Sequence, residues 1–104
     1  MSPYLYIAQL AIPKEKEAEL NELYDSGYLP ALRLVPGVLK AKRFKLEWSD
    51  DPDMPKYLAV YELDSPDVPH SQEWKNASIR CGWAEKVRPY FTTRRHGMFR
   101  AAEE

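Results

Sequence analysis

Two stretches of the chain are apolar at almost every position. Residues 4–12 read YLYIAQLAI and residues 57–63 read YLAVYEL, and aromatic or β-branched side chains recur in both. A strand that is covered on both faces has this continuous pattern, whereas a strand with one wet face alternates. We therefore predict that these two stretches form the central strands of one sheet.

Two further strands are predicted from stretches that mix charged and apolar residues. Residues 38–48 read VLKAKRFKLEW, and charged side chains occur at both alternating sets of positions. Charged residues are typical of edge strands, which must not pair with other chains. The last strand is predicted over residues 91–99, FTTRRHGMF.

A helical region is expected between the first two strands. Pro13 ends the first strand, and four apolar residues then recur at helical spacing: Ala18, Leu20, Leu23 and Tyr24. Gly27 is expected to stop this helix, and a short second turn over residues 28–34 has Pro30 near its start. The sequence thus predicts two short helical segments rather than one.

A second helical region is expected between the last two strands. Ser71 can cap a helix, and the residues that follow include Trp74, Ala77 and Ile79. Gly82 is expected to bend or interrupt this helix, after which residues 83–87 continue it. The chain would then enter its last strand.

The predicted order is β-α-β, a loop, and again β-α-β. Two such units usually form an α+β, ferredoxin-like domain, in which a four-stranded antiparallel sheet carries both helices on one face. We expect residues 1–104 to form this single domain. Because both central strands are apolar on both faces, a second copy of the sheet is the simplest cover for the bare face. A homodimer is therefore expected.

Composition narrows the class of protein further. The 15 lysines and arginines nearly balance the 16 aspartates and glutamates, so that the net charge is −1 and a dedicated nucleic-acid binder is not expected. Cys81 is the sole cysteine, which excludes an internal disulfide and favours a cytoplasmic protein. Residues 1–13 lack a basic n-region and are too short to span a membrane, so neither a signal peptide nor membrane attachment is expected.

Three segments carry a resemblance to a known family. They read LYDSGYLPALRLVPGVLKAKRF, YLAVYELDSPDV and EWKNASIRCGWAEKVRP. This pattern resembles the dimeric α/β-barrel superfamily and, within it, the small EthD-like proteins. The resemblance implies the ferredoxin-like fold and a homodimer. It implies no single reaction, because such proteins include cofactor-free monooxygenases, cyclases, decarboxylases, isomerases, haem-degrading enzymes and proteins without a known activity.

The sequence departs from the family at one informative place. Related sequences often carry a Glu-His pair just before the Ile/Leu-Pro that begins the second helical turn. Here Gly27 and Tyr28 stand before Leu29 and Pro30. An acid or base at that position is therefore not expected in this chain, although Tyr28 could donate a hydrogen bond.

His96 and Tyr57 are the candidate catalytic residues. An imidazole titrates near neutral pH, so His96 could act as a general base, although it could equally be a strand residue bonded to backbone or at the dimer seam. Tyr57 resembles the strand position where superfamily cyclases carry a polar ring or imidazole. Trp74 looks similar to their aromatic residue on the covering helix. Both aromatic residues could instead be ordinary core.

Three more residues complete the predicted substrate-binding set with Trp74: Tyr28, Tyr61 and Arg80. Tyrosines can line a cavity for a planar aromatic or polyketide-like molecule and bond its oxygens. Arg80 could bind a carboxylate or stabilise an enolate, or it could be a surface charge. Arg43, Arg94 and Arg95 would favour an anionic ligand if they pointed inwards.

No metal or cofactor is expected. The two histidines and one cysteine are widely spaced and do not make a zinc set, and a glycine-rich phosphate loop is lacking. His70 sits at a loop–helix junction where exposure is usual, and Cys81 has no base beside it in the sequence.

The primary hypothesis is a cofactor-independent enzyme, of the lyase or isomerase kind, that cyclises, decarboxylates or isomerises an aromatic or polyketide-like molecule. A non-catalytic dimer that binds a small molecule or a protein is the alternative that the missing Glu-His pair favours. A haem- or oxygen-using monooxygenase relative is the third hypothesis. A cavity between sheet and helices that contains His96 or two converging tyrosines would favour the first.

Overall fold

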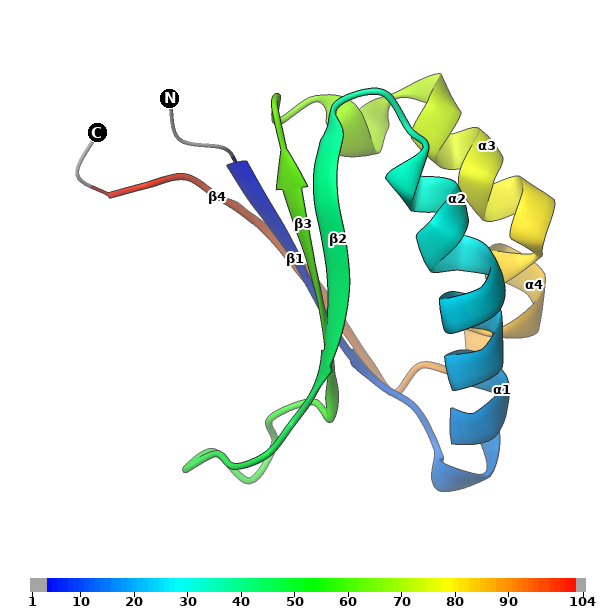
Figure 1. Ribbon diagram of the computed structural model, residues 1–104. Helices are drawn as coiled ribbons and strands as arrows, with labels where there is room; N and C mark the ends of the chain where they lie inside the picture. The colour runs from blue at the N-terminus through cyan, green and yellow to red at the C-terminus, as the bar shows by residue number, and fades with distance from the viewer. Residues whose placement is uncertain (1–3, 103–104) are drawn as a thin grey trace.

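The computed structural model describes residues 4–102, and its centre is one four-stranded sheet. The strands are β1 (Tyr4–Ala11), β2 (Val38–Lys45), β3 (Tyr57–Leu63) and β4 (Thr93–Phe99). Their order across the sheet is β2-β3-β1-β4, and every neighbouring pair is antiparallel (Figure 1). The predicted fold is confirmed, with β1 and β3 as the central strands and β2 at an edge.

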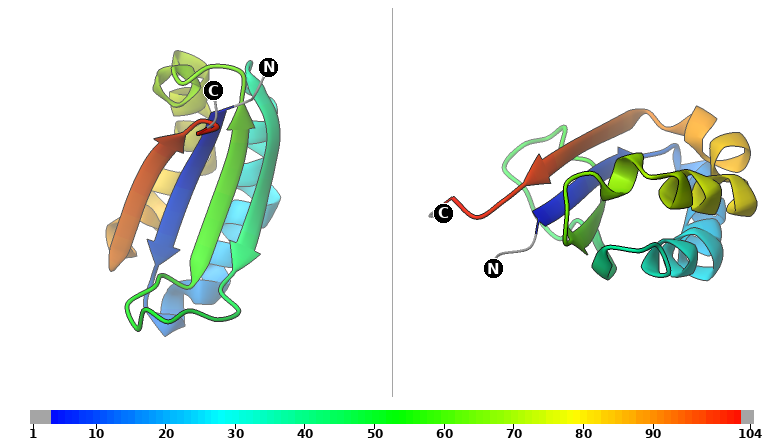
Figure 2. Two further views of the ribbon diagram at one scale, coloured as in Figure 1. Left: turned by 90° about the vertical axis from the view of Figure 1, so that its left-hand side faces the viewer. Right: turned by 90° about the horizontal axis from the view of Figure 1, so that it is seen from above.

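Both connections between strands cross the same face of the sheet. After a 3₁₀ turn at Lys14–Lys16, α1 (Glu17–Leu23), a π turn (Tyr24–Tyr28) and α2 (Leu29–Arg33) follow one another directly. The second connection consists of a 3₁₀ turn (Val68–His70), α3 (Gln72–Cys81), α4 (Trp83–Lys86) and another 3₁₀ turn (Arg88–Tyr90). Figures 1 and 2 show all of these helices on one side of the sheet.

The predicted helix stop at Gly27 is wrong. Gly27 lies inside the π turn, and the positive φ angles recorded among residues 4–102 belong to Gly37 and Gly82. The helical path therefore runs on from α1 into α2. Burial explains this, because Tyr24, Tyr28 and Leu32 are all buried against the core and outweigh the weak local preference of one glycine.

The predictions for the second helix are mostly confirmed. The Trp74 backbone N–H donates to Ser71 Oγ over 3.3 Å, so Ser71 is the N-cap of α3. Gly82 ends α3 with a φ of +75°, a left-handed conformation that suits glycine. Trp74 is buried, whereas Ile79 is exposed.

Two predicted strands are shorter in the structure. The strand expected over residues 38–48 ends at Lys45, and Trp48 lies in the loop that follows. The strand expected over residues 91–99 begins at Thr93, after a 3₁₀ turn that contains Pro89. One further backbone hydrogen bond extends each pairing, because the Leu46 N–H donates to the Lys56 carbonyl and the Thr92 N–H donates to the Ala11 carbonyl.

Strand pairing separates the two faces of the sheet. Tyr61 pairs with Tyr6 and with Ala41, which puts these side chains on the helix-facing side. Along β3, buried residues alternate with half-buried ones, and the half-buried set is Leu58, Val60 and Glu62. This second set lies on the face that no helix covers within residues 4–102, which Figure 2 shows from the front in its left view.

Candidate functional site

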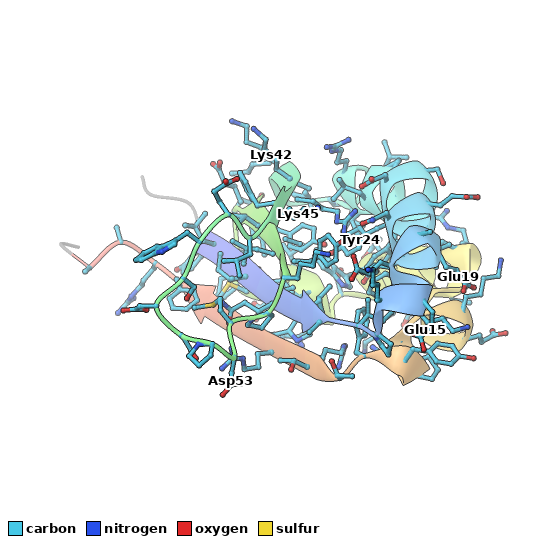
Figure 3. The ribbon with its side chains drawn as sticks, turned by 90° about the horizontal axis from the view of Figure 1, so that it is seen from below. Glu15, Glu19, Tyr24, Lys42, Lys45 and Asp53 are labelled. Carbon is cyan, nitrogen blue, oxygen red and sulfur yellow. The ribbon has the colours of Figure 1, made fainter. Side chains whose placement is uncertain are left out.

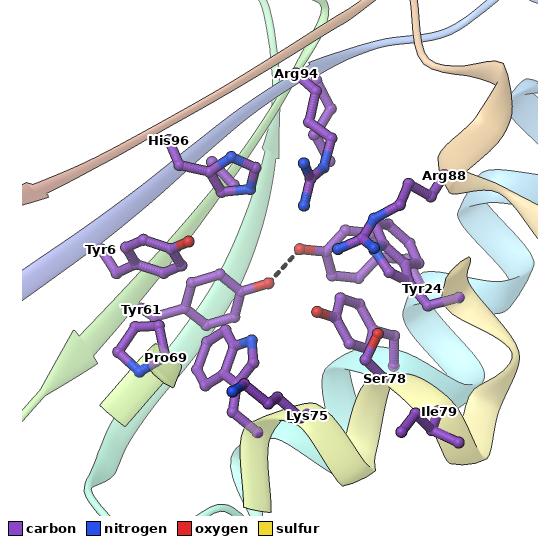
Figure 4. A pocket seen from close by; sticks show the side chains of 15 residues that line it. Tyr6, Tyr24, Tyr61, Pro69, Lys75, Ser78, Ile79, Arg88, Arg94 and His96 are labelled. Carbon is purple, nitrogen blue, oxygen red and sulfur yellow. Dashed lines mark hydrogen bonds between the residues drawn. The ribbon is translucent and has the colours of Figure 1, made fainter. Parts of the chain in front are cut away.

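A cavity of about 420 Å³ lies between the sheet and the helices (Figure 4). Strands β1, β3 and β4 form one wall, and the turn before α2 together with α3 and α4 forms the other. Its lining residues are Tyr6, Ala8, Leu10, Tyr24, Tyr28, Tyr61, Pro69, Trp74, Lys75, Ser78, Ile79, Trp83, Arg88, Arg94 and His96. This volume falls within the range of small-molecule sites.

Aromatic rings form most of the apolar wall. The Trp74 ring is edge-on to Tyr6 and to Tyr61, with centroids 5.7 and 5.1 Å apart. On the helical side, Tyr28 stacks on Trp83 at 4.3 Å between centroids with an interplanar angle of 18°. These contacts hold the rings in place, which suits the binding of a planar molecule.

Three tyrosine hydroxyls in this cavity are held in their protonated form. The hydroxyls of Tyr24 and Tyr61 are hydrogen-bonded to each other. Burial raises the pKa of both, and it raises the pKa of Tyr28 to about 12. At neutral pH these groups can therefore donate hydrogen bonds, but none of them is suited to act as a base.

The charged side chains of the lining are all basic. Arg88, Arg94 and Lys75 line the cavity, and none of its lining residues is an aspartate or glutamate. Figure 4 shows the side chains of Arg88 and Arg94 directed inwards from the end of the second connection and from β4. Such a cavity favours an anionic or electron-rich ligand.

His96 reaches the cavity because of the strand register. His96 pairs with Ala8 of β1, and Ala8 is a buried, helix-facing residue. The imidazole stacks on the Tyr6 ring, with centroids 5.6 Å apart and an interplanar angle of 25°. Partial burial lowers the pKa of His96, and the positive charges of Arg94 and Arg88 lower it further. The neutral imidazole, which can accept a proton, is thereby favoured.

The structure brings four of the sequence-predicted site residues together in this cavity: His96, Tyr28, Tyr61 and Trp74. Tyr57 does not line it, although Tyr57 and Tyr61 share the helix-facing side of β3. Instead, the Tyr57 hydroxyl donates to Glu17 Oε1 over 2.9 Å, and Lys56 bonds the same oxygen over 2.7 Å. Tyr57 is a buried residue of the far end of the sheet.

Arg80 also lies outside the cavity. It is exposed on α3 and lines a separate surface depression with Glu73 and Asn76. The expectation that Arg80 faces the same space as His96 is therefore not met. The helical period explains this, because Trp74, Ser78 and Cys81 mark the inner side of α3 and Arg80 lies well round the helix from them.

Sequence reasoning missed three lining residues that shape the cavity: Tyr24, Trp83 and Arg88. Figure 3 shows Tyr24 between the helices and the sheet, whereas Glu15 and Glu19 point outwards from the start of the same connection. The helical spacing had marked Tyr24 only as core. Arg94 was detectable, because it lies two residues before His96 on the same strand and hence on the same face.

The described residues give no sign of a metal site or of a membrane-spanning helix. Within residues 4–102, no group of three His, Cys, Asp or Glu side chains is placed to hold a metal ion. In the same residues, no helix is both long enough and apolar enough to cross a membrane.

Comparison with known proteins identifies the fold. No protein-family model matches the chain, and no curated protein matches it. Solved structures do match, among them an EthD family protein of Bacillus halodurans, with a TM-score of 0.65, 19% identity, and coverage of 93% of this chain and 97% of that one. A putative antibiotic biosynthesis monooxygenase of Bordetella bronchiseptica has a TM-score of 0.71 at 13% identity, with 98% and 99% of the two chains covered.

A third match is the haem degrader MhuD of Mycobacterium tuberculosis, whose structure holds two haems in its active site. Its TM-score is 0.64 at 20% identity, and 96% of each chain is covered. These proteins differ in chemistry, so their likeness identifies the architecture and not the reaction. The chain therefore has the fold of the dimeric α/β-barrel superfamily, the group that its sequence resembles.

Proposed function

We propose that this protein is a cofactor-independent enzyme that transfers a proton within an aromatic or polyketide-like substrate, as cyclases, decarboxylases and isomerases do. One observation carries the proposal. The same cavity holds a wall of aromatic rings, inward-facing arginines, and an imidazole whose pKa is lowered. These are the parts that carbon-acid chemistry needs at neutral pH.

The proposed step uses His96 as the general base. A planar substrate packs against Trp74 and Tyr61, and an acidic C–H of the substrate gives its proton to a ring nitrogen of His96. The electron pair stays on the substrate, where it delocalises onto a carbonyl oxygen as an enolate. Arg88 and Arg94 line the same cavity and stabilise the negative charge.

The experiment measures proton exchange directly. 2′-Hydroxyacetophenone, a small aryl methyl ketone, is incubated with the protein in D₂O, and NMR follows the loss of its methyl protons. We expect His96→Ala to lower the protein-dependent rate by roughly a hundredfold. His70→Ala is the matched control, because His70 is an exposed histidine outside the cavity. Equal rates in wild type and His96→Ala would contradict the assignment of the base.

A non-catalytic dimer that binds a small molecule is the second candidate function. It is favoured by Gly27 and Tyr28, which stand where relatives often carry the Glu-His pair. Tyr28 stays protonated and packs on Trp83, so it contributes binding surface and not a base. Binding of the aryl ketone without protein-dependent exchange would favour this function over the first.

We also propose that the protein acts as a homodimer through the open face of the sheet. Leu5, Phe44 and Phe99 are exposed on that face, and Ile7 and Val60 lie between them. Lys42, Glu62 and Arg95 lie on the same face beside these side chains. An exposed apolar patch that is bordered by polar residues is typical of an interaction surface. A structure with the same fold, from Thermobifida fusca, is described as a dimeric ferredoxin-like protein, with a TM-score of 0.65 at 12% identity.

A further inference from the structure

Tyr24 and Tyr61 form a hydroxyl pair at the centre of the cavity. Tyr24 comes from the π turn of the first connection, and Tyr61 comes from the central strand β3. Each residue is only 1% exposed, and both line the cavity. Figure 4 shows their hydroxyl groups pointing at each other across the space between sheet and helices.

A count of protons shows that this pair has a donor to spare. Two phenol groups carry two O–H protons, and the bond between them uses one. Burial raises the pKa of both residues, so both protons are present at neutral pH. Among residues 4–102, each hydroxyl has only the other as its hydrogen-bond partner. One O–H group therefore remains available to a molecule in the cavity.

We propose that the Tyr24–Tyr61 pair donates a hydrogen bond to an oxygen of the ligand and that this oxygen belongs to a phenolate or enolate. The inference rests on the proposed function and names the place where the negative charge develops. The bond inside the pair strengthens the outward donor, because consecutive hydrogen bonds polarise one another. The rings are already fixed by packing, so the donor needs little reorganisation when charge appears.

Arg43 supports the pair from outside the cavity. Its guanidinium lies 4.6 Å from the centroid of the Tyr24 ring. Two further contacts fix it there, a 2.8 Å ion pair with Asp25 and a 2.9 Å hydrogen bond to the Asn21 side-chain oxygen. A positive charge behind the ring draws electron density from the phenol, which makes its O–H a better donor. Arg43 is thus a positioning residue that does not itself line the cavity.

The other polar groups of the cavity are less suited to this role. Arg88, Arg94 and Lys75 carry flexible side chains and all three are exposed, so water weakens the stabilisation that each of them gives to a negative charge. The tyrosine pair is buried, neutral and rigid. It can therefore discriminate an oxygen anion from an uncharged ring by direct hydrogen bonding.

The test uses two probes of similar shape. 4-Nitrophenol offers an oxygen that can ionise, and its ionised form absorbs visible light, whereas nitrobenzene has no such oxygen. We expect binding to wild-type protein to lower the apparent pKa of 4-nitrophenol. The double variant Tyr24→Phe/Tyr61→Phe is expected to weaken 4-nitrophenol binding at least about tenfold and to leave nitrobenzene binding unchanged.

Tyr57→Phe is the matched control, because its hydroxyl bonds Glu17 and lies outside the cavity. The single variants Tyr24→Phe and Tyr61→Phe should lose less affinity than the double variant, since each keeps one hydroxyl. If the double variant binds 4-nitrophenol as tightly as wild type, the donor role is wrong while the cavity stands as a ligand site. If wild type binds neither probe, the proposed function and this inference both fail.

Discussion

The two faces of the same sheet differ in chemistry. On the helix-facing side, Tyr6 and Tyr61 of the central strands and His96 of β4 point into a cavity with aromatic walls and basic groups. On the open side, the same central strands present apolar side chains such as Ile7 and Val60 together with the polar residues Gln9 and Glu62. Alternation along a strand therefore assigns neighbouring residues to two separate tasks.

This difference teaches where a substitution should act. A residue on the helix-facing side supports the fold of its own chain and the candidate site. A substitution on the open side should cost the single chain little, and in the proposed homodimer it should change how tightly the two chains associate. Matched substitutions, one on each face of the same strand, therefore test whether the two faces differ in this way.

The largest effect on stability is expected at Leu63. Its side chain is fully buried on the helix-facing side, so Leu63→Ala should lower the free energy of unfolding by about 2–5 kcal/mol. Leu58→Ala, on the open face of the same strand, should cost less because Leu58 is only half-buried in the single chain. Urea denaturation at low protein concentration measures both. Equal costs would contradict the difference between the faces.

The next effect concerns assembly. Ile7 lies opposite Val60 and Gly97 on the open face, and it lines a shallow depression there together with Arg95. Ile7→Glu should raise the dissociation constant of the proposed dimer by at least about a hundredfold, because a charged side chain would replace an apolar one in the surface that the two sheets bury. Light scattering across a dilution series measures this. Leu34→Glu, on the helical layer and 81% exposed, is the control that should stay dimeric.

An intermediate effect is expected within the hydroxyl pair. Tyr24→Phe leaves the buried Tyr61 hydroxyl without its partner, which should lower the free energy of unfolding by about 1–3 kcal/mol. Adding Tyr61→Phe should restore part of that loss, since both polar groups are then gone. Thermal melts of the two single variants and the double variant form the cycle. Strictly additive losses would contradict a direct bond between the hydroxyls.

The smallest effect is a shift along the pH axis. Partial burial, Arg94 and Arg88 lower the pKa of His96, so its neutral form should persist below the pH at which an ordinary imidazole takes up a proton. The acid limb, the pH range in which the exchange rate falls as His96 takes up a proton, should then lie below about pH 6.5, the usual pKa of histidine. Arg94→Gln should move the limb upwards, because it removes one positive charge. A limb at the same pH in both proteins would contradict this coupling.

The same pKa shift sets the sign of its effect on stability. Because the pKa of His96 is lower in the folded chain, the unfolded chain binds more protons between the two values. The stabilisation from a neutral His96 is therefore present above the unfolded value and is lost as the pH falls through that range. His96→Gln should remove this part of the acid sensitivity, which denaturant titrations at several pH values can measure.

Much of the fold could be predicted because its signals are local and strong. The continuous apolar runs at residues 4–12 and 57–63 identified the central strands, and Ser71 and Gly82 marked the ends of α3. Gly27 misled because the signal of one glycine is weak beside the burial of Tyr24 and Tyr28. Local chemistry therefore sufficed where no long-range packing opposed it.

The candidate site was predictable only in part. Tyr57 and Tyr61 share one face of β3, but four residues of strand span about 13 Å, which is enough to separate a cavity residue from the far end of the sheet. Whether the side chains of Arg80 and Tyr24 face the cavity depended on which side of each helical segment packs against the sheet. Alternation predicts the sheet face on which a side chain lies. It does not predict which of the residues on that face reach the cavity.

The sequence by itself determined the order of elements, the central position of two strands and the apolar character of both sheet faces. Only the tertiary structure decided which tyrosines meet, that His96 stacks on Tyr6, and that Arg88 and Arg94 share a cavity with them. The difference arises from the separation along the sequence over which each kind of interaction acts. Hydrophobic period and turn chemistry act over a few residues, whereas the Tyr24–Tyr61 bond joins residues 37 positions apart. Such a contact exists only after the helices have packed on the sheet.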